Sequence, residues 1–111
     1  MDAPITTHIL DTSAGRPASG VSVTLVREGT SGIIAVGDTD DDGRVDEWSQ
    51  SFELELGNYT LSFEVEDYFA SRNEPSFYST IQISFKVAST DQHYHVPLLL
   101  NPFGYSTYRG S

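Results

Sequence analysis

Apolar and polar side chains alternate with a period of two residues along much of this chain. Every second residue is apolar in four segments, at positions 21–25, 52–56, 59–65 and 81–87. Successive side chains of a strand point to opposite faces of its sheet. Each segment therefore predicts a strand with one buried face and one solvated face.

Weaker versions of the same pattern predict further, shorter strands. These lie at positions 6–10, 33–37, 94–100 and 106–109. Segments rich in glycine, proline and aspartate separate the strands and supply the backbone angles of tight turns. Seven or eight short strands spaced in this way predict an all-β fold, an antiparallel β-sandwich. Residues 67–73, DYFASRN, break the alternation and predict a helical turn or one short helix.

Length and charge limit the domain count and the classes of partner. A chain of 111 residues is long enough for one core and too short for two ordinary domains, so we expect a single domain over residues 1–111. Sixteen acidic and six basic residues give a formal charge of −10. Nucleic acids and anionic membranes bind basic surfaces, so both are excluded as expected partners. Small molecules and other copies of the same chain remain as the expected binding partners.

The absence of cysteine, of a long apolar run and of a signal peptide limits the chemistry and the cellular location that we expect for this protein. The chain has no cysteine, which excludes disulfides, thiolate metal sites and a cysteine nucleophile. No apolar run approaches the roughly 20 residues that span a bilayer. Residues 1–10, MDAPITTHIL, lack the basic start and apolar centre of a signal peptide. We therefore expect a cytoplasmic protein, with the peroxisome as the alternative.

An acidic segment at residues 38–48, DTDDDGRVDEW, admits two interpretations. Its first half follows the spacing of a helix-flanked calcium loop, but Ser49 stands where that loop needs a bidentate glutamate, and its flanks predict strands. A solvated turn is therefore favoured. Asp42 and Gly43 form a common hairpin pair, so Arg44 is expected to begin a strand with its side chain at the end of the sheet.

Histidine is scarce, with only His8, His93 and His95 in the chain. In a strand, residues two apart share a face, so His93 and His95 have a spacing that suits a metal. No carboxylates stand at a matching spacing, and one solvent-facing and one packed histidine is the favoured interpretation, without a metal. An imidazole transfers protons readily at neutral pH, which makes His8 and His95 candidates for general acid–base chemistry.

The C-terminal segment at residues 94–111, YHVPLLLNPFGYSTYRGS, carries a specific motif. It resembles the signature of the 5-hydroxyisourate hydrolases, a transthyretin-like family of purine breakdown whose chains end in Tyr-Arg-Gly-Ser. The resemblance covers nearly the whole chain, because four further segments are also similar to the family: THILDTSAGRPASGVSV, DDGR, GNYTLSFEVEDYF and FYSTIQISFKV. Asn101 and Ser79 depart from the usual serine and proline, in positions that we expect to be loops or strand starts.

The resemblance implies a fold, a reaction and a site. The fold is a transthyretin-like, or prealbumin-like, sandwich, and the reaction is hydrolysis of 5-hydroxyisourate to 2-oxo-4-hydroxy-4-carboxy-5-ureidoimidazoline in urate degradation. A histidine would accept a proton from the attacking water while an arginine stabilises the developing oxyanion. The resemblance does not decide which histidine acts as the base. The implied catalytic residues are His8, Arg44 and His95, and the implied substrate contacts are His8, Arg44, Tyr108, Arg109 and Ser111.

The family also implies an assembly and the absence of a cofactor. Its members form homotetramers, dimers of dimers with sites in the channel between dimers, and their reaction needs only water and proton transfer. We also expect an extension beyond Ser111 to damage activity.

Two noncatalytic alternatives remain open. One is a transthyretin-like carrier of a small ligand, although carriers lack the Tyr-Arg-Gly-Ser end. The other is an extracellular β-sandwich module, suggested by the acidic segment and the Asn58-Tyr59-Thr60 sequon. The absence of a leader and of cysteines argues against it.

Overall fold

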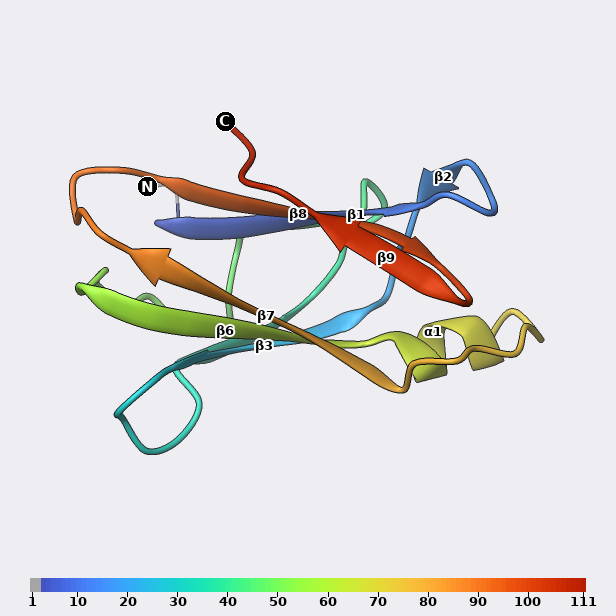
Figure 1. Cartoon of the computed structure of the whole chain (residues 1–111), viewed down its shortest axis with the longest axis horizontal. Coiled ribbons are helices and arrows are strands. Elements are labelled where there is room, and N and C mark those ends of the chain that lie inside the picture. Colours follow the sequence, from blue (N-terminus) through green and yellow to red (C-terminus); the bar gives the residue numbers. More distant parts are fainter. Residues whose placement is uncertain (1–2) are drawn as a thin grey trace.

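The computed structural model describes residues 3–111, which form two β-sheets packed as layers (Figure 1). The first sheet contains β1 (Ile5–Asp11), β2 (Arg16–Pro17), β5 (Arg44–Val45), β8 (Tyr94–Asn101) and β9 (Gly104–Thr107). The second contains β3 (Ser22–Arg27), β4 (Ala35–Asp38), β6 (Gly57–Glu64) and β7 (Thr80–Val87). A short helix, α1 (Val65–Ala70), follows β6. The predicted β-sandwich with one short helix is confirmed, with two-residue strands β2 and β5 added to the expected set.

The alternation places the core between the two sheets. On β6, Tyr59, Leu61 and Phe63 are at most 1% exposed, and Ile5 and Ile9 of β1 are fully buried. These side chains belong to one apolar cluster that draws on both sheets. Burial of apolar surface contributes roughly 25 cal/mol per Å², so this shared cluster is what holds the layers together.

One pairing in the first sheet departs from the antiparallel pattern. Strands β1 and β8 run parallel, with Ile5 opposite Tyr94 and Asp11 opposite Leu100, whereas every other strand pair of the described chain is antiparallel. Parallel strands need a long connection, and here the entire second sheet lies between them in sequence. Side-chain alternation carries no information on strand direction, which is why the sequence did not predict this pair.

The predicted strand at residues 52–56 is wrong. Residues 51–55 have no regular secondary structure, although Phe52 and Leu54 still pack against the core. The alternation here reflects side-chain packing without a partner strand, and the backbone N–H of Glu55 donates to the Tyr59 hydroxyl at 3.0 Å. Apolar periodicity reports which side chains are buried, whereas a strand also requires a neighbouring backbone.

Several predicted boundaries are shifted, and the helix and the last strand are two examples. The helix expected at residues 67–73 begins at Val65, two residues earlier, and Glu66 and Asp67 occupy its first turn, where acidic side chains interact favourably with the helix dipole. The last strand occupies Gly104–Thr107 instead of residues 106–109.

No helix within residues 3–111 is long and apolar enough to cross a membrane.

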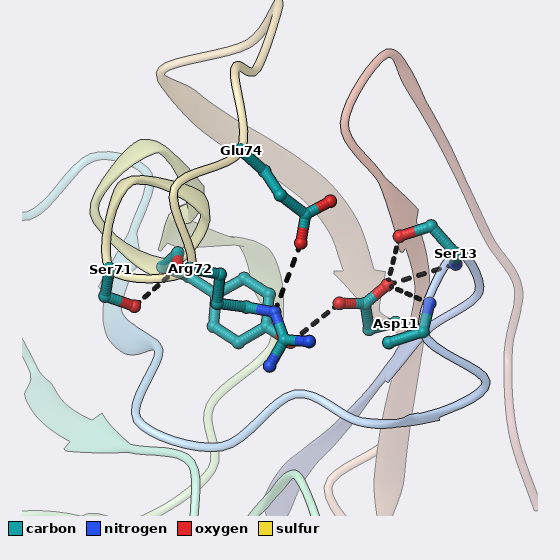
Figure 2. Close-up of polar contacts among 7 residues, drawn as sticks. Asp11, Ser13, Ser71, Arg72 and Glu74 are labelled. Atoms are coloured by element: carbon teal, nitrogen blue, oxygen red, sulfur yellow. Dashed lines mark hydrogen bonds and ion pairs between the residues drawn. The ribbon is translucent and has the colours of Figure 1, made fainter.

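A buried carboxylate connects the first sheet to α1. Asp11, fully buried at the end of β1, accepts hydrogen bonds from the Tyr68 hydroxyl at 2.7 Å, from the hydroxyl and N–H of Ser13, and from the N–H of Ala14. Figure 2 shows these contacts converging on Asp11. Burial by itself would raise the pKa of Asp11, but the hydrogen bonds outweigh it and bring the pKa below its ordinary value. Burial and the Asp11 contact raise the pKa of Tyr68 to about 12.

Replacing Tyr68 with phenylalanine is expected to lower the free energy of unfolding by about 1.5–3 kcal/mol, because a buried hydrogen bond to a charged group is lost. A carboxyl with a lowered pKa stabilises the fold above its unfolded pKa, and this contribution disappears as the pH falls through the folded value. The difference between the variant and the wild type should therefore shrink as the pH falls below 3.8. Urea unfolding of both proteins at neutral and acid pH measures this difference in the free energy of unfolding.

Tyr78→Phe is the matched control, since its ring makes edge-to-face contacts with Phe77 and Tyr105 that survive the substitution. Its free energy of unfolding should stay within about 0.5 kcal/mol of the wild type. Equal losses in the two variants would contradict a special role for the contact between Tyr68 and Asp11.

Candidate active site

The parallel pairing of β1 with β8 brings two of the singled-out histidines together. Thr6 lies opposite His95 and His8 lies opposite Pro97, so His8 and His95 point to the same outer face of the first sheet. Their rings stack with centroids 6.4 Å apart and planes inclined by 26°. Strand β5 then places Arg44 opposite His8. The three predicted catalytic residues, distant in sequence, therefore share one surface.

The acidic turn before Arg44 is built around Asp40 and Gly43. The Asp40 carboxylate accepts the N–H groups of Asp42 and Arg44, at 2.9 and 3.0 Å. Gly43 has a φ of +75°, and a Cβ there would lie 2.5 Å from the carbonyl oxygen of Ile9. Only glycine allows this close approach. The solvated turn favoured by the sequence is what the structure contains, and its function is to start β5 at Arg44.

The C-terminal tail folds back against His95. Gly110 donates its N–H to the carbonyl oxygen of His95 at 2.9 Å, and a Cβ on Gly110 would lie 2.6 Å from Cδ2 of the His95 ring. The Arg109 guanidinium lies 4.7 Å from the centre of the Tyr94 ring and donates to Gln92 at 2.7 Å. The tail thus fixes one edge of His95, and Arg109 holds the tail in place.

Two hollows open beside His95. The larger, about 900 Å³, is lined by Arg44, His95 and Ser111, and the smaller, about 210 Å³, is lined by His95, Tyr108 and Arg109. Tyr108 is 58% exposed. Other residues at the larger hollow are mostly polar: Thr6, Thr7, Asp46, Glu47, Thr90, Asp91, Gln92 and His93, with Ala3 and Pro4. The predicted contact residues other than His8 therefore line one of two hollows that share His95.

The electrostatic surroundings favour a neutral His95. Burial lowers the pKa of His95, and the charges of Arg44, His8 and His93 lower it further. A neutral imidazole at physiological pH retains a lone pair on one ring nitrogen and can accept a proton. This face of the sheet can therefore supply a base near a guanidinium, two groups suited to the hydrolysis of an activated carbonyl.

Comparison with known proteins identifies the family. Residues 5–110 match the model of the family described as "HIUase/Transthyretin family". The chain belongs to this family. The match spans both sheets, and it confirms the resemblance found in the sequence.

Relatives within the HIUase/transthyretin family include enzymes and a ligand-binding protein. The 5-hydroxyisourate hydrolase 2 of Rhizobium meliloti is 46% identical over 114 residues, covering 96% of this chain and 95% of the relative. The structure of Klebsiella pneumoniae 5-hydroxyisourate hydrolase has a TM-score of 0.84 and 40% identity, over 96% of this chain and 98% of the other. Sea bream transthyretin in complex with thyroxine has a TM-score of 0.88 and 27% identity, over 97% and 95%. The two solved structures share the fold of this chain, so the fold alone does not distinguish a hydrolase from a thyroxine-binding protein.

Sequence reasoning missed one member of this site and undervalued another. The Thr6 hydroxyl lies 2.8 Å from Nδ1 of His95 and 3.1 Å from Nε2 of His93, a residue to which the sequence assigns no catalytic role. The available signal was the position of Thr6 two residues before His8, on the same strand face. Within residues 3–111 no group of three or more histidine and acidic side chains lies close enough to hold a metal ion.

Proposed function

We propose that this protein hydrolyses 5-hydroxyisourate to 2-oxo-4-hydroxy-4-carboxy-5-ureidoimidazoline, a step of urate degradation. The observation that carries the proposal is the convergence of His8, Arg44 and His95 with the C-terminal tail on one sheet face. The surrounding chain is 46% identical to a protein named 5-hydroxyisourate hydrolase 2. The geometry and the relatives support the same chemistry.

The proposed reaction begins with attack of water on a ring carbonyl of this flat, polar substrate. His95 accepts a proton from the water, since its lowered pKa keeps the ring neutral. Arg44 donates to the carbonyl oxygen as negative charge develops there. His8, stacked on His95, is the second proton-transfer group.

Collapse of the tetrahedral intermediate breaks the ring C–N bond and gives a carboxylic acid, which loses its proton to solvent. The departing nitrogen takes up the proton that the water gave to His95, so the histidine ends each cycle neutral. Every atom comes from the substrate and one water, and we propose that no cofactor takes part. Tyr108 and Ser111 contact the substrate in this scheme, while Arg109 acts through the tail by its contacts with Tyr94 and Gln92.

A homotetramer, a dimer of dimers, is the proposed assembly. One edge strand of each sheet, β9 in the first and β7 in the second, has backbone groups without a neighbouring strand in the described chain. Edge strands readily pair with a second copy, and two-fold symmetry closes such contacts. The site face would then lie between dimers, where water is partly excluded. Light scattering should give a mass of four chains, and a monomer at micromolar concentration would contradict this assembly.

A coupled ultraviolet assay tests the proposed function. Urate oxidase generates 5-hydroxyisourate in place, and its decay is followed with and without this protein. We expect decay well above the spontaneous rate. Decay at the spontaneous rate from folded protein would overturn the proposal and favour a small-ligand carrier, which the likeness to sea bream transthyretin in complex with thyroxine would then support.

The pH dependence of kcat/KM is a further prediction. Burial and the charges of Arg44, His8 and His93 lower the pKa of His95, so the base stays neutral to a lower pH than an ordinary histidine. Activity should therefore persist below pH 6.5 and decline only as His95 becomes protonated. An acid limb centred above that value in the wild type would contradict His95 as the base.

A further inference from the structure

A single hydroxyl group connects two histidine rings beside the proposed site. Thr6 lies on β1 opposite His95, is 8% exposed, and has its Oγ1 at 2.8 Å from His95 Nδ1 and 3.1 Å from His93 Nε2. The rings of His93 and His95 lie 6.5 Å apart with planes inclined by 18°. The three side chains form a continuous line of hydrogen-bonding groups along the face of the first sheet.

The hydroxyl group has one hydrogen, so the two contacts cannot have the same direction. If Thr6 donates to His93, it accepts a hydrogen bond from the Nδ1–H of His95; if it donates to His95, it accepts from the Nε2–H of His93. The first arrangement leaves Nε2 of a neutral His95 unprotonated, and the second places the His95 proton on Nε2. The direction of the Thr6 hydroxyl therefore decides whether neutral His95 is a base or an acid at Nε2.

The edge of His95 that carries Nε2 is the edge left for a substrate. Thr6 occupies the Nδ1 side of the ring, and Gly110 approaches Cδ2 so closely that a Cβ would lie 2.6 Å away. The edge formed by Nε2 and Cε1 points away from the strand backbone. His95 is half-buried and lines both hollows.

We propose that Thr6 and His93 form a proton relay for His95, an inference that rests on the proposed hydrolysis. When Nε2 of His95 takes a proton from the attacking water, its Nδ1–H passes to Thr6 Oγ1, and the Thr6 hydroxyl hydrogen passes to Nε2 of His93. The positive charge moves to His93 and no proton is gained or lost. The reverse transfers return the proton through Nε2 of His95 to the departing nitrogen.

The surroundings of the two histidines give this transfer a direction. His95 is half-buried, and burial, Arg44, His8 and His93 all lower its pKa, so a cation there is unfavourable. His93 is exposed at the larger hollow, where solvent stabilises a cation. Three acidic side chains line the same hollow and also stabilise a positive charge on His93: Asp46, Glu47 and Asp91. Thr6 and His93 are thus positioning residues that act through His95.

Thr6→Val and His93→Gln test the relay, because valine keeps the shape of threonine without the hydroxyl and glutamine cannot take up a proton. Each should lower kcat about 10- to 100-fold with KM within about twofold, a share of what general acid–base catalysis contributes. Thr6→Ser keeps the hydroxyl and should rescue most of the activity. Thr60→Val, which loses a hydroxyl in the second sheet that contacts Ser84, is the matched control and should resemble the wild type.

Tautomer-sensitive ¹⁵N NMR of the histidine rings provides a readout that needs no substrate. In the wild type, neutral His95 should carry its proton on Nδ1, which is the tautomer that the relay requires. Thr6→Val should shift the population of neutral His95 toward the Nε2–H tautomer. Wild-type kcat in both Thr6→Val and His93→Gln, or a His95 tautomer unchanged by Thr6→Val, would overturn the relay. Failure of the wild type to accelerate substrate decay would instead overturn the proposed hydrolysis, so the two failures are distinguishable.

Discussion

His95→Asn is expected to lower kcat by about 10²- to 10⁴-fold, the usual contribution of a general base. Asparagine is shorter than histidine, but its amide lies near the position of Nδ1 and can still hydrogen-bond to Thr6, so the loss should come from proton transfer. KM should change far less than kcat, because the proton moves only during the reaction. The coupled assay measures both constants.

Folding is the main control for His95→Asn. His95 is half-buried on the outer face of β8 and is not part of the apolar cluster between the two sheets. The melting temperature of His95→Asn should therefore stay close to that of the wild type. Gln82→Asn, on an exposed position of β7, is a matched control for loss of side-chain length and should keep full activity. A folded His95→Asn protein within about threefold of wild-type kcat would exclude His95 as the base.

Arg44→Ala is expected to lower kcat/KM by about 10²- to 10³-fold, the effect of removing one donor to a developing oxyanion. A second effect follows from charge, because Arg44 helps to lower the pKa of His95. Without Arg44 the pKa of His95 should rise, and the acid limb of kcat/KM should move to higher pH. Arg44→Lys should recover the position of the limb but only part of the rate, because lysine lacks the planar fork.

Arg16→Ala is the control for Arg44→Ala. Arg16 is an exposed arginine on β2, which also pairs with β1, and its loss removes the same charge from the same sheet. It should leave both kcat/KM and the acid limb unchanged. Equal losses in Arg16→Ala and Arg44→Ala would indicate a general effect of net charge and would contradict a direct contact between Arg44 and the substrate.

Much of the fold could be predicted because side-chain alternation follows burial. Residues 59–65 and 81–87 correspond closely to β6 and β7, and the turn before Arg44 was recognised from its aspartate and glycine. The prediction failed at residues 52–56, where alternating side chains pack without a partner strand. A sequence pattern records how much of each side chain is buried, but pairing depends on backbone that is distant in sequence.

The candidate site was predicted in part, and for a different reason. His8, Arg44 and His95 were singled out by residue type and by the resemblance of the motifs around them, and the structure places them on one face. Thr6 was missed, because a threonine in a strand has no chemical signature until its neighbours are known. His93 was noticed, yet its contact with Thr6 could not be foreseen.

Local periodicity and motifs were enough to predict the layered β architecture, the turn that presents Arg44 and the family. The parallel pairing of β1 with β8, in the register that sets Thr6 opposite His95, became visible only in the folded chain. Register between distant strands follows from how the two buried faces fit together, and a shift by one residue would turn His8 toward the core. The meeting of Thr6, His93 and His95 is a consequence of that packing.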